Sequence, residues 1–173
     1  MNKSSLQILT ISVVLVLVQV IVLNRICLFG VAVPLAFIYV ILRLPISMAK
    51  EWLFTIAFVL GFIVDVFSDT AGINTLSCLV IAALRGPVLH LYFPREDELS
   101  NPLPSIATLG PFVYFKYALT LAFIYCLSVF FLESFSMFRF WHLVQCVLAS
   151  TVLTTALLIG IDSITLPRRE KRL

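Results

Sequence analysis

The sequence predicts an all-α integral membrane protein, a six-helix transmembrane bundle that forms a single domain over residues 1–173. Composition is the first reason: 61% of the residues are apolar, 12% are charged, and the mean hydropathy is +1.10. Soluble domains have roughly 45–50% apolar and about 25% charged residues, so this chain has too few charges to cover a surface in water. Length is the second reason, because six crossings of roughly 20 residues each use about 120 residues and leave only loops and tails.

The first crossing is expected at about residues 6–23, and it ends at Asn24-Arg25. The apolar stretch continues to residue 42, and a single helix over all of it would be roughly 55 Å long at about 1.5 Å per residue. The hydrocarbon core is only about 30 Å thick, so the chain must turn back at these two polar residues. No small-residue cleavage site follows residue 23, so we expect the first helix to remain uncleaved.

The second crossing is expected to end at Arg43 and to begin near residue 26 or near residue 33. Pro34 favours the later start, because proline lacks an N–H group and fits the first turn of a helix better than its middle. In that case residues 26–32 form an irregular apolar strip, which a membrane tolerates only where protein covers it.

The third and fourth crossings are expected at about residues 49–67 and 72–92. The Asp-Thr pair at 69–70 lies between them and resembles the residues that cap the N-terminus of a helix. We expect a bend near Pro87 in the fourth crossing, because proline removes a helical hydrogen bond.

The fifth and sixth crossings are expected at about residues 111–132 and 143–161. The longest loop, at 93–109, precedes the fifth crossing and contains the acidic run at 96–98, to which we assign no role. A basic tail at 167–173 ends the chain. This tail is expected to attract anionic lipid of the inner leaflet at about 1 kcal/mol per basic residue, or only to fix the topology.

Basic residues in short loops predict the orientation, because cytoplasmic loops carry an excess of lysine and arginine. In a six-helix arrangement, both termini and the loops at 43–51 and 93–109 share one side. That side has eight basic residues: Lys3, Arg43, Lys50, Arg95, Arg168, Arg169, Lys171 and Arg172. The opposite side has Arg25 and Arg139. We therefore expect both termini in the cytoplasm.

Motifs for catalysis or cofactor binding are absent from the sequence. It contains no G-x-S-x-G, no H-E-x-x-H and no phosphate-binding loop, and its two histidines are predicted on opposite membrane sides. The cysteines are far apart and form no C-x-x-C pair, so we interpret them as small buried apolar residues: Cys27, Cys78, Cys126 and Cys146. We predict no enzymatic activity, no cofactor, no metal site and no nucleic-acid partner.

Asp65 is the first candidate for a specific role, because a carboxylate inside a transmembrane helix is costly unless it faces protein or water. Gly61 precedes it by four residues on the same helical face and lets another backbone approach closely. One interpretation is a polar contact that organises a helix interface or a partner's binding site, with Gly61, Asp65, Asp69, Gly72 and Asn74 as the candidate interface residues. The other interpretation is an acid that reaches the interfacial water next to a helix cap.

Arg85, Lys116 and Asp162 are the candidate polar residues inside the membrane. All three are predicted in the cytoplasmic half of the helices. A buried guanidinium needs a carboxylate partner, so we expect an internal ion pair of Asp162 with Arg85 or with Lys116. The alternative is that the basic side chains extend to the membrane surface.

The segment at 60–74, LGFIVDVFSDTAGIN, resembles the central segment of the MreD family of rod-shape-determining membrane proteins. That segment has a glycine, an aspartate four residues later, a short polar turn, and a glycine that opens the next helix; Gly61, Asp65 and Gly72 match it. The segment at 83–89 resembles one branch of the same family, and the length and the proline near the start of the second crossing also agree.

The resemblance implies a non-catalytic scaffold in the bacterial cytoplasmic (inner) membrane that helps organise peptidoglycan synthesis and rod cell shape. It implies a direct partner, MreC, which is a single-pass protein with a periplasmic domain. It also implies membership of a complex with the RodA glycan polymerase, its penicillin-binding transpeptidase and MreB filaments. The implied fold is similar to that of the substrate-binding subunits of energy-coupling-factor transporters.

Two alternatives stay open at this point. One is a small-molecule-binding subunit of an energy-coupling-factor transporter, although the Ala-x-x-x-Ala pattern typical of its first helix has no counterpart in residues 6–23. The other is a membrane enzyme, because Gly61-x3-Asp65-x3-Asp69 resembles the second half of the metal-binding signature of CDP-alcohol phosphotransferases. That signature also needs an Asp pair, a glycine and an Ala-Arg shortly upstream, where this chain has Met-Ala-Lys-Glu-Trp at 48–52, so half of the carboxylates are missing.

Overall fold

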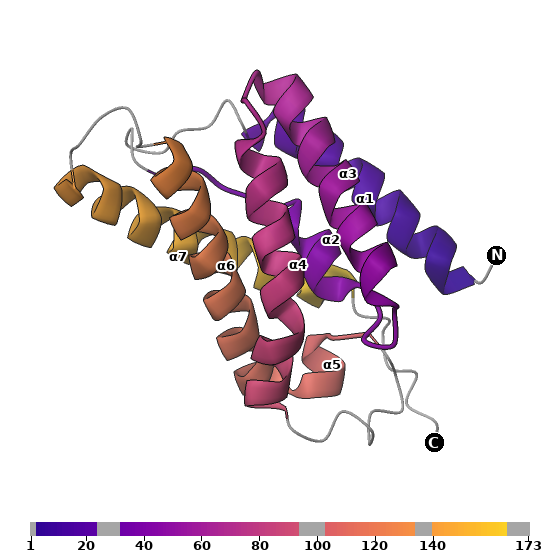
Figure 1. Ribbon diagram of the computed structural model, residues 1–173. Helices are drawn as coiled ribbons and strands as arrows, with labels where there is room; N and C mark the ends of the chain where they lie inside the picture. Colours follow the sequence, from indigo (N-terminus) through magenta and orange to yellow (C-terminus); the bar gives the residue numbers. More distant parts are fainter. Residues whose placement is uncertain (1–2, 24–31, 94–102, 134–139, 166–173) are drawn as a thin grey trace, which may run out of the picture.

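Figure 1 shows the computed structural model of the chain, which describes residues 3–23, 32–93, 103–133 and 140–165. The described residues form the helices α1 (Lys3–Ile21), α2 (Ile38–Arg43), α3 (Lys50–Ser68), α4 (Ile73–Tyr92), α5 (Ile106–Leu109), α6 (Pro111–Glu133) and α7 (Phe140–Thr165). Most of the predicted strip at 26–32, the acidic run at 96–98 and the basic tail lie outside the described residues.

Four of the described helices, α3, α4, α6 and α7, are long and apolar enough to cross a membrane. Their bounds agree to within a few residues with the predictions at 49–67, 72–92, 111–132 and 143–161. The chain is therefore a multi-pass, all-helical membrane protein. The count of six transmembrane helices is not confirmed, because α1 contributes only a shorter apolar stretch, Thr10–Ile21, and the second predicted crossing contains only the six-residue α2.

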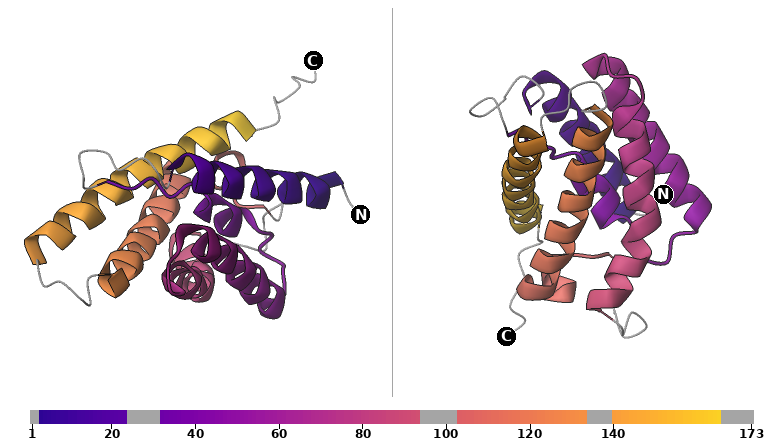
Figure 2. Two further views of the ribbon diagram at one scale, coloured as in Figure 1. Left: turned by 90° about the horizontal axis from the view of Figure 1, so that it is seen from above. Right: turned by 60° about the vertical axis from the view of Figure 1, so that its left-hand side comes forward.

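The long helices form a bundle in which α4 lies between α3 and α6, and α6 also packs against α7. In Figure 1, α3, α4 and α6 run side by side, while α1 and α7 cross this group at an angle. The left view of Figure 2 shows α1 and α7 together on one side of α3 and α4. The short α2 contacts α1, α3 and α4, so it lies inside the bundle.

The second predicted crossing differs from the expected helix at 33–43. Residues 32–37 are not helical, and α2 begins only at Ile38, so the expectation that Pro34 opens a helix is wrong. The apolar side chains explain why this irregular backbone is tolerated: residues 35–42 are at most 5% exposed. Protein covers the segment on all sides, as a broken backbone at membrane depth requires.

Side chains of the neighbouring helices satisfy the backbone of this segment. Gln19 on α1 donates through Nε2 to the Pro34 carbonyl at 3.0 Å and accepts the N–H of Ala36 at 2.9 Å. On α7, Ser150 accepts the N–H of Val33 at 3.0 Å, and Thr154 accepts that of Leu35 at 3.2 Å. These side chains replace the helical hydrogen bonds that the backbone lacks, so its polar groups are not left bare in an apolar interior.

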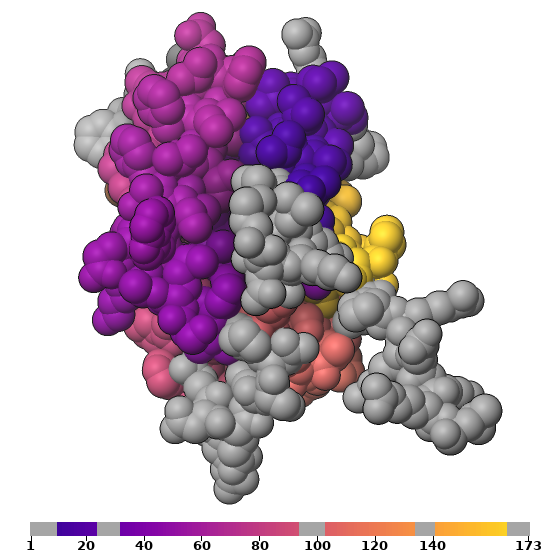
Figure 3. Space-filling view, turned by 90° about the vertical axis from the view of Figure 1, so that its right-hand side faces the viewer, coloured from indigo at the N-terminus to yellow at the C-terminus, as the bar shows by residue number. Residues whose placement is uncertain are grey.

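The outer surface of the bundle is apolar, as expected of helices that face lipid. Large exposed apolar side chains occur on α1, α3, α4, α6 and α7. Figure 3 shows one such face, where α1 in indigo lies next to α3 in purple. Cys78, Cys126 and Cys146 are buried and form no disulfide with one another, which agrees with their interpretation as small core residues. Cys27 lies outside the described residues.

Candidate functional sites

The turn between α3 and α4 is built on two left-handed backbone positions. Asp69 ends α3 with φ of 54°, and Gly72 precedes α4 with φ of 81°. Glycine adopts such a φ without a steric penalty, and aspartate is among the few other residues that adopt it. The backbone N–H groups of Asp69 and Thr70 both donate to the Asp65 carbonyl, which closes the end of α3.

The Asp65 carboxylate lies directly under this turn and is only 4% exposed. Its Oδ1 accepts the Thr70 hydroxyl at 2.5 Å and both the backbone N–H and the Nδ2 of Asn74 at 3.0 Å. Its Oδ2 accepts the N–H of Thr75 at 2.8 Å and the Thr75 hydroxyl at 2.5 Å. Asp65 therefore caps the N-terminus of α4 from the neighbouring helix, where a negative charge also meets the positive end of the helix dipole.

This arrangement corrects the expected cap at 69–70. The residue at the N-cap of α4 is Gly72, which has no side chain, and Asp69 belongs to the end of α3. Asp69 is exposed and Gly72 is partly exposed, whereas Asp65 and Asn74 are buried. Of the two interpretations of Asp65, the one that fits its burial is a polar contact that organises a helix interface, here an internal one.

Gly61 and Asn74 extend the same contact. An added Cβ on Gly61 would lie 2.6 Å from the Cα of Thr75, so α3 and α4 approach each other too closely for any side chain at this position. Asn74 accepts the Tyr125 hydroxyl at 2.7 Å through its side-chain oxygen, which joins α6 to the cluster. We call Gly61, Asp65, Thr70, Asn74, Thr75 and Tyr125 the outer polar cluster.

A second polar cluster lies at the opposite end of the bundle around Asp162, which is fully buried on α7. Asp162 accepts the N–H of Ile106 at 2.8 Å, the Tyr39 hydroxyl at 2.9 Å, and Nη1 of Arg43 at 3.3 Å. The Arg43 guanidinium also contacts the Tyr39 hydroxyl and lies 5.5 Å from the centre of the Tyr39 ring. These contacts hold the buried α2 and the start of α5 against α7.

Arg85 joins this cluster without a carboxylate partner among the described residues. The buried guanidinium donates to the Leu44 carbonyl and, through Nε, to the Tyr117 hydroxyl at 3.3 Å. Tyr117 in turn donates to the Leu42 carbonyl at 3.2 Å. The positive charge therefore lies against the C-terminal carbonyls of α2, the negative end of that helix.

The expected ion pair of Asp162 with Arg85 or Lys116 is therefore wrong. Asp162 pairs with Arg43, which is the ion pair found among the described residues. Lys116 lies with its Nζ 4.4 Å from the centre of the Phe112 ring on its own helix. We call Tyr39, Arg43, Arg85, Tyr117 and Asp162 the inner polar cluster, because the distribution of basic residues predicts this end in the cytoplasm.

Sequence reasoning missed three residues of these contacts that carried a signal. Gln19 is an amide within the apolar run at 11–23, and such residues form polar contacts between membrane helices. Arg43 was assigned only to the end of a helix, although it is next to the apolar segment that contains Tyr39. Tyr125 lies in the middle of the fifth predicted crossing, where its hydroxyl needs a partner.

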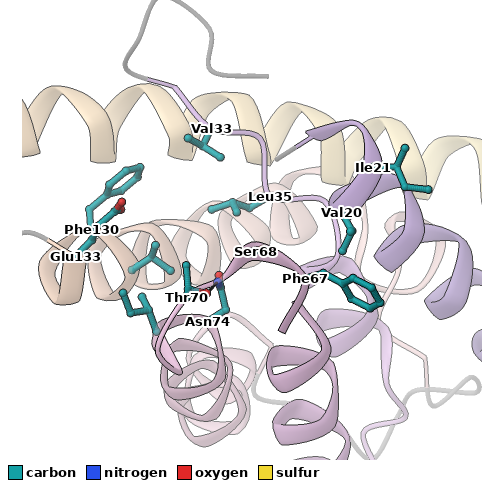
Figure 4. Close-up of a pocket in the computed structure, with 12 residues that line it drawn as sticks. Val20, Ile21, Val33, Leu35, Phe67, Ser68, Thr70, Asn74, Phe130 and Glu133 are labelled. Atoms are coloured by element: carbon teal, nitrogen blue, oxygen red, sulfur yellow. Dashed lines mark hydrogen bonds between the residues drawn. The ribbon is translucent and has the colours of Figure 1, made fainter. Parts of the chain in front are cut away.

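A cavity of about 640 Å³ lies beside the outer polar cluster (Figure 4). It is lined by α1, the irregular segment before α2, the α3–α4 turn and the end of α6: Val20, Ile21, Val33, Leu35, Phe67, Ser68, Thr70, Ile73, Asn74, Val129, Phe130 and Glu133. In Figure 4, Phe130 and Glu133 lie across the cavity from Val20 and Ile21, with Thr70 and Asn74 below Leu35.

The described residues offer little for metal chemistry. They contain no group of three or more histidine, cysteine, aspartate or glutamate side chains that could hold a metal ion. The five hydrogen bonds to Asp65 occupy both of its oxygens. Asp69, the other aspartate of the resemblance to CDP-alcohol phosphotransferases, points to the exterior of the turn, where it is exposed.

Comparisons with protein-family models, curated proteins and solved structures give no match for this chain. The family and the expected likeness to transporter substrate-binding subunits therefore stay predictions.

Proposed function

We propose that the chain is a non-catalytic membrane scaffold of the MreD type, which binds a single-pass partner of the MreC type. Its place would be the bacterial inner membrane, in a complex with a RodA-type glycan polymerase, its penicillin-binding transpeptidase and MreB filaments. The observation that carries the proposal is the outer polar cluster. Of the three residues on which the resemblance depends, Gly61 and Asp65 belong to this cluster, and Gly72 shapes the turn next to it.

Each of these residues has a physical reason to be what it is. Gly61 permits the close approach of α3 and α4, Asp65 supplies the cap of α4, and Gly72 provides the left-handed turn between them. Because the structural roles of these three residues depend on one another, their joint match to the family segment is more specific than three unrelated single-residue matches would be. This interdependence supports the resemblance from which the scaffold function comes.

The proposed topology has six crossings, with residues 33–43 as a broken second crossing. This segment contacts α7 in order: Val33 meets Ser150, Leu35 meets Thr154, and Tyr39 and Arg43 meet Asp162. The distance from residue 150 to residue 162 along a helix is about 18 Å at about 1.5 Å per residue, so the segment follows α7 through much of a core about 30 Å thick.

The same contacts support an even number of crossings. The segment and α7 run in the same direction, so both would go from the outer to the inner side. With α1 as the first crossing, all six segments alternate and both termini lie in the cytoplasm. The basic tail would then face anionic lipid of the inner leaflet, where attraction is about 1 kcal/mol per basic residue.

Side chains that are buried within the fold cannot contact a partner, so a partner must bind to residues with exposed surface. Gly61, Asp65 and Asn74 are engaged within the fold, and of the five candidate interface residues Asp69 and Gly72 have exposed surface. Asp69 is the better probe, because asparagine also tolerates the left-handed conformation and Asp69→Asn removes only the charge.

The experiment is affinity purification of the full chain from native membranes, followed by identification of the retained proteins. We expect a single-pass protein with a large domain outside the membrane among the retained proteins. Asp69→Asn should reduce its recovery, whereas Glu51→Gln, an exposed acid at the other end of α3, should not. Recovery of a transporter energising module, or of no single-pass protein, would contradict the proposed function.

A further inference from the structure

We propose that the cavity beside the outer polar cluster binds an amphipathic organic cation, that is, an ammonium or guanidinium group carried on an apolar body. The cavity has a size suited to a ligand, because binding pockets are typically about 300–1,000 Å³ and this one is about 640 Å³. It combines apolar walls with a few polar groups, which is the usual composition of a site that orients its ligand.

The lining residues that the structure describes carry charge of one sign. Among these twelve residues there is no lysine, arginine or histidine, and Glu133 is the charged one. Thr70 and Asn74 form another part of the wall, and both donate to the buried Asp65 carboxylate behind them. A ligand in the cavity therefore meets one exposed carboxylate directly and lies close to a second, buried one.

Glu133 lies at a position where a carboxylate is unfavourable for the stability of its helix. It is the last residue of α6, at the negative end of the helix dipole, where a basic residue is preferred and a carboxylate is unfavourable. Its carboxylate takes part in no hydrogen bond or ion pair with any residue that the structure describes, and Figure 4 shows it on the cavity wall beside Phe130. Residues that break a local preference without compensation in the fold are candidates for function.

The walls define the rest of the ligand. Val20 and Ile21 on α1 lie across the cavity from Phe130 on α6, with Val33 above, so the part of the ligand that enters between the helices must be apolar. Two sources supply this chemistry: an aminophospholipid of the membrane and a water-soluble amphipathic amine. The inference concerns the cavity alone and does not depend on the scaffold function.

The test is photolabelling of the purified full chain in nanodiscs of phosphatidylcholine and phosphatidylglycerol. The probe is an alkylamine that carries a diazirine, and the matched control is the alkyl carboxylate of the same length. We expect the amine to label peptides that line the cavity about tenfold more strongly than the carboxylate does, because a hydrogen bond to a charged group is worth about that factor.

Three variants keep the result interpretable. Glu133→Gln should remove the preference for the amine, while Glu51→Gln, an exposed acid on α3 outside the cavity, should leave it unchanged. Val33→Phe should reduce labelling by filling the cavity while the carboxylate stays in place. Equal labelling by the two probes, or an unchanged preference in Glu133→Gln, would overturn the inference.

A third arm separates the two sources. Addition of phosphatidylethanolamine to the nanodiscs should suppress labelling of the cavity by the amine if the membrane supplies the ligand. Labelling that is unaffected by this lipid, but suppressed by a soluble alkylamine, assigns the site to a water-soluble amine. Suppression by the zwitterionic lipid and by the alkyl carboxylate alike would show that charge is not recognised, against the inference.

Discussion

Gly61→Ala tests the close contact between α3 and α4 with a single added methyl group. Gly61 is buried in α3, and the new Cβ would lie 2.6 Å from the Cα and 2.9 Å from the backbone nitrogen of Thr75. Both atoms belong to the first turn of α4, so they cannot move without the helix. Rotation of a flexible side chain therefore offers no relief, and the two helices must separate.

The expected effect is a loss of about 1–2 kcal/mol in the free energy of unfolding. Forcing an extra methyl group into a packed interior typically costs about 1–3 kcal/mol. Alanine in a helix recovers up to about 1 kcal/mol relative to glycine, which offsets part of this cost. The separation also lengthens the hydrogen bonds of Asp65 to Thr75, so the net change should lie in the upper part of the range.

The assay is unfolding of the purified protein in mixed micelles by titration with a denaturing detergent, followed by circular dichroism. The matched control is Gly160→Ala on α7, where an added Cβ meets nothing within 4 Å. We expect the control to be neutral or slightly stabilising and Gly61→Ala to unfold at a lower detergent fraction. If both variants unfold together, the proposed contact between α3 and α4 is refuted.

Three further predictions concern the polar clusters and use the same assay. Asp65→Asn should lower the free energy of unfolding by several kcal/mol, because an amide cannot accept all the N–H and O–H donors that surround Asp65. Each donor left unsatisfied costs about 1–3 kcal/mol. A loss below about 1 kcal/mol would refute this role. Asp162→Asn should lower the free energy of unfolding by about 3–5 kcal/mol, because it leaves Arg43 unpaired. The double variant with Arg43→Met should lose less than the sum of the losses in the two single variants. Additive losses would show that the pair is not coupled. Gln19→Leu should increase proteolysis of the broken segment after reconstitution, because the Pro34 carbonyl and the Ala36 N–H lose their partner. Cleavage equal to that of the unsubstituted protein would count against it.

The four long helices were predictable because hydropathy and length decide them. Each is a run of about 20 apolar residues bounded by charges, prolines or a polar turn, which is the strongest signal an apolar sequence contains. Their bounds agree with the predictions to within a few residues. The same signal failed for residues 33–43, because hydropathy reports that a segment is buried and does not distinguish burial in lipid from burial in protein.

The partners of the polar residues were less predictable, for a physical reason. Asp65 and Asp162 were correctly identified as unusual, since a carboxylate in an apolar helix needs a partner. Their actual partners are mostly backbone N–H groups and hydroxyls, such as those of Thr75 and Ile106. Every residue carries such groups, so a sequence search for complementary charges selected Arg85 and Lys116 and overlooked Arg43.

Both polar clusters stabilise buried charges with groups of the protein itself, and this determines where a partner or ligand can bind. Each places a buried aspartate against backbone N–H groups, and the inner cluster places arginine against the carbonyls at the end of α2. Charges satisfied in this manner are unavailable to other molecules, because removing any one contact leaves a buried polar group without a partner. Recognition must therefore use the groups that the fold leaves unsatisfied. Among the described acidic residues near the outer end these are Asp69 and Glu133, one on the turn and one on the cavity wall.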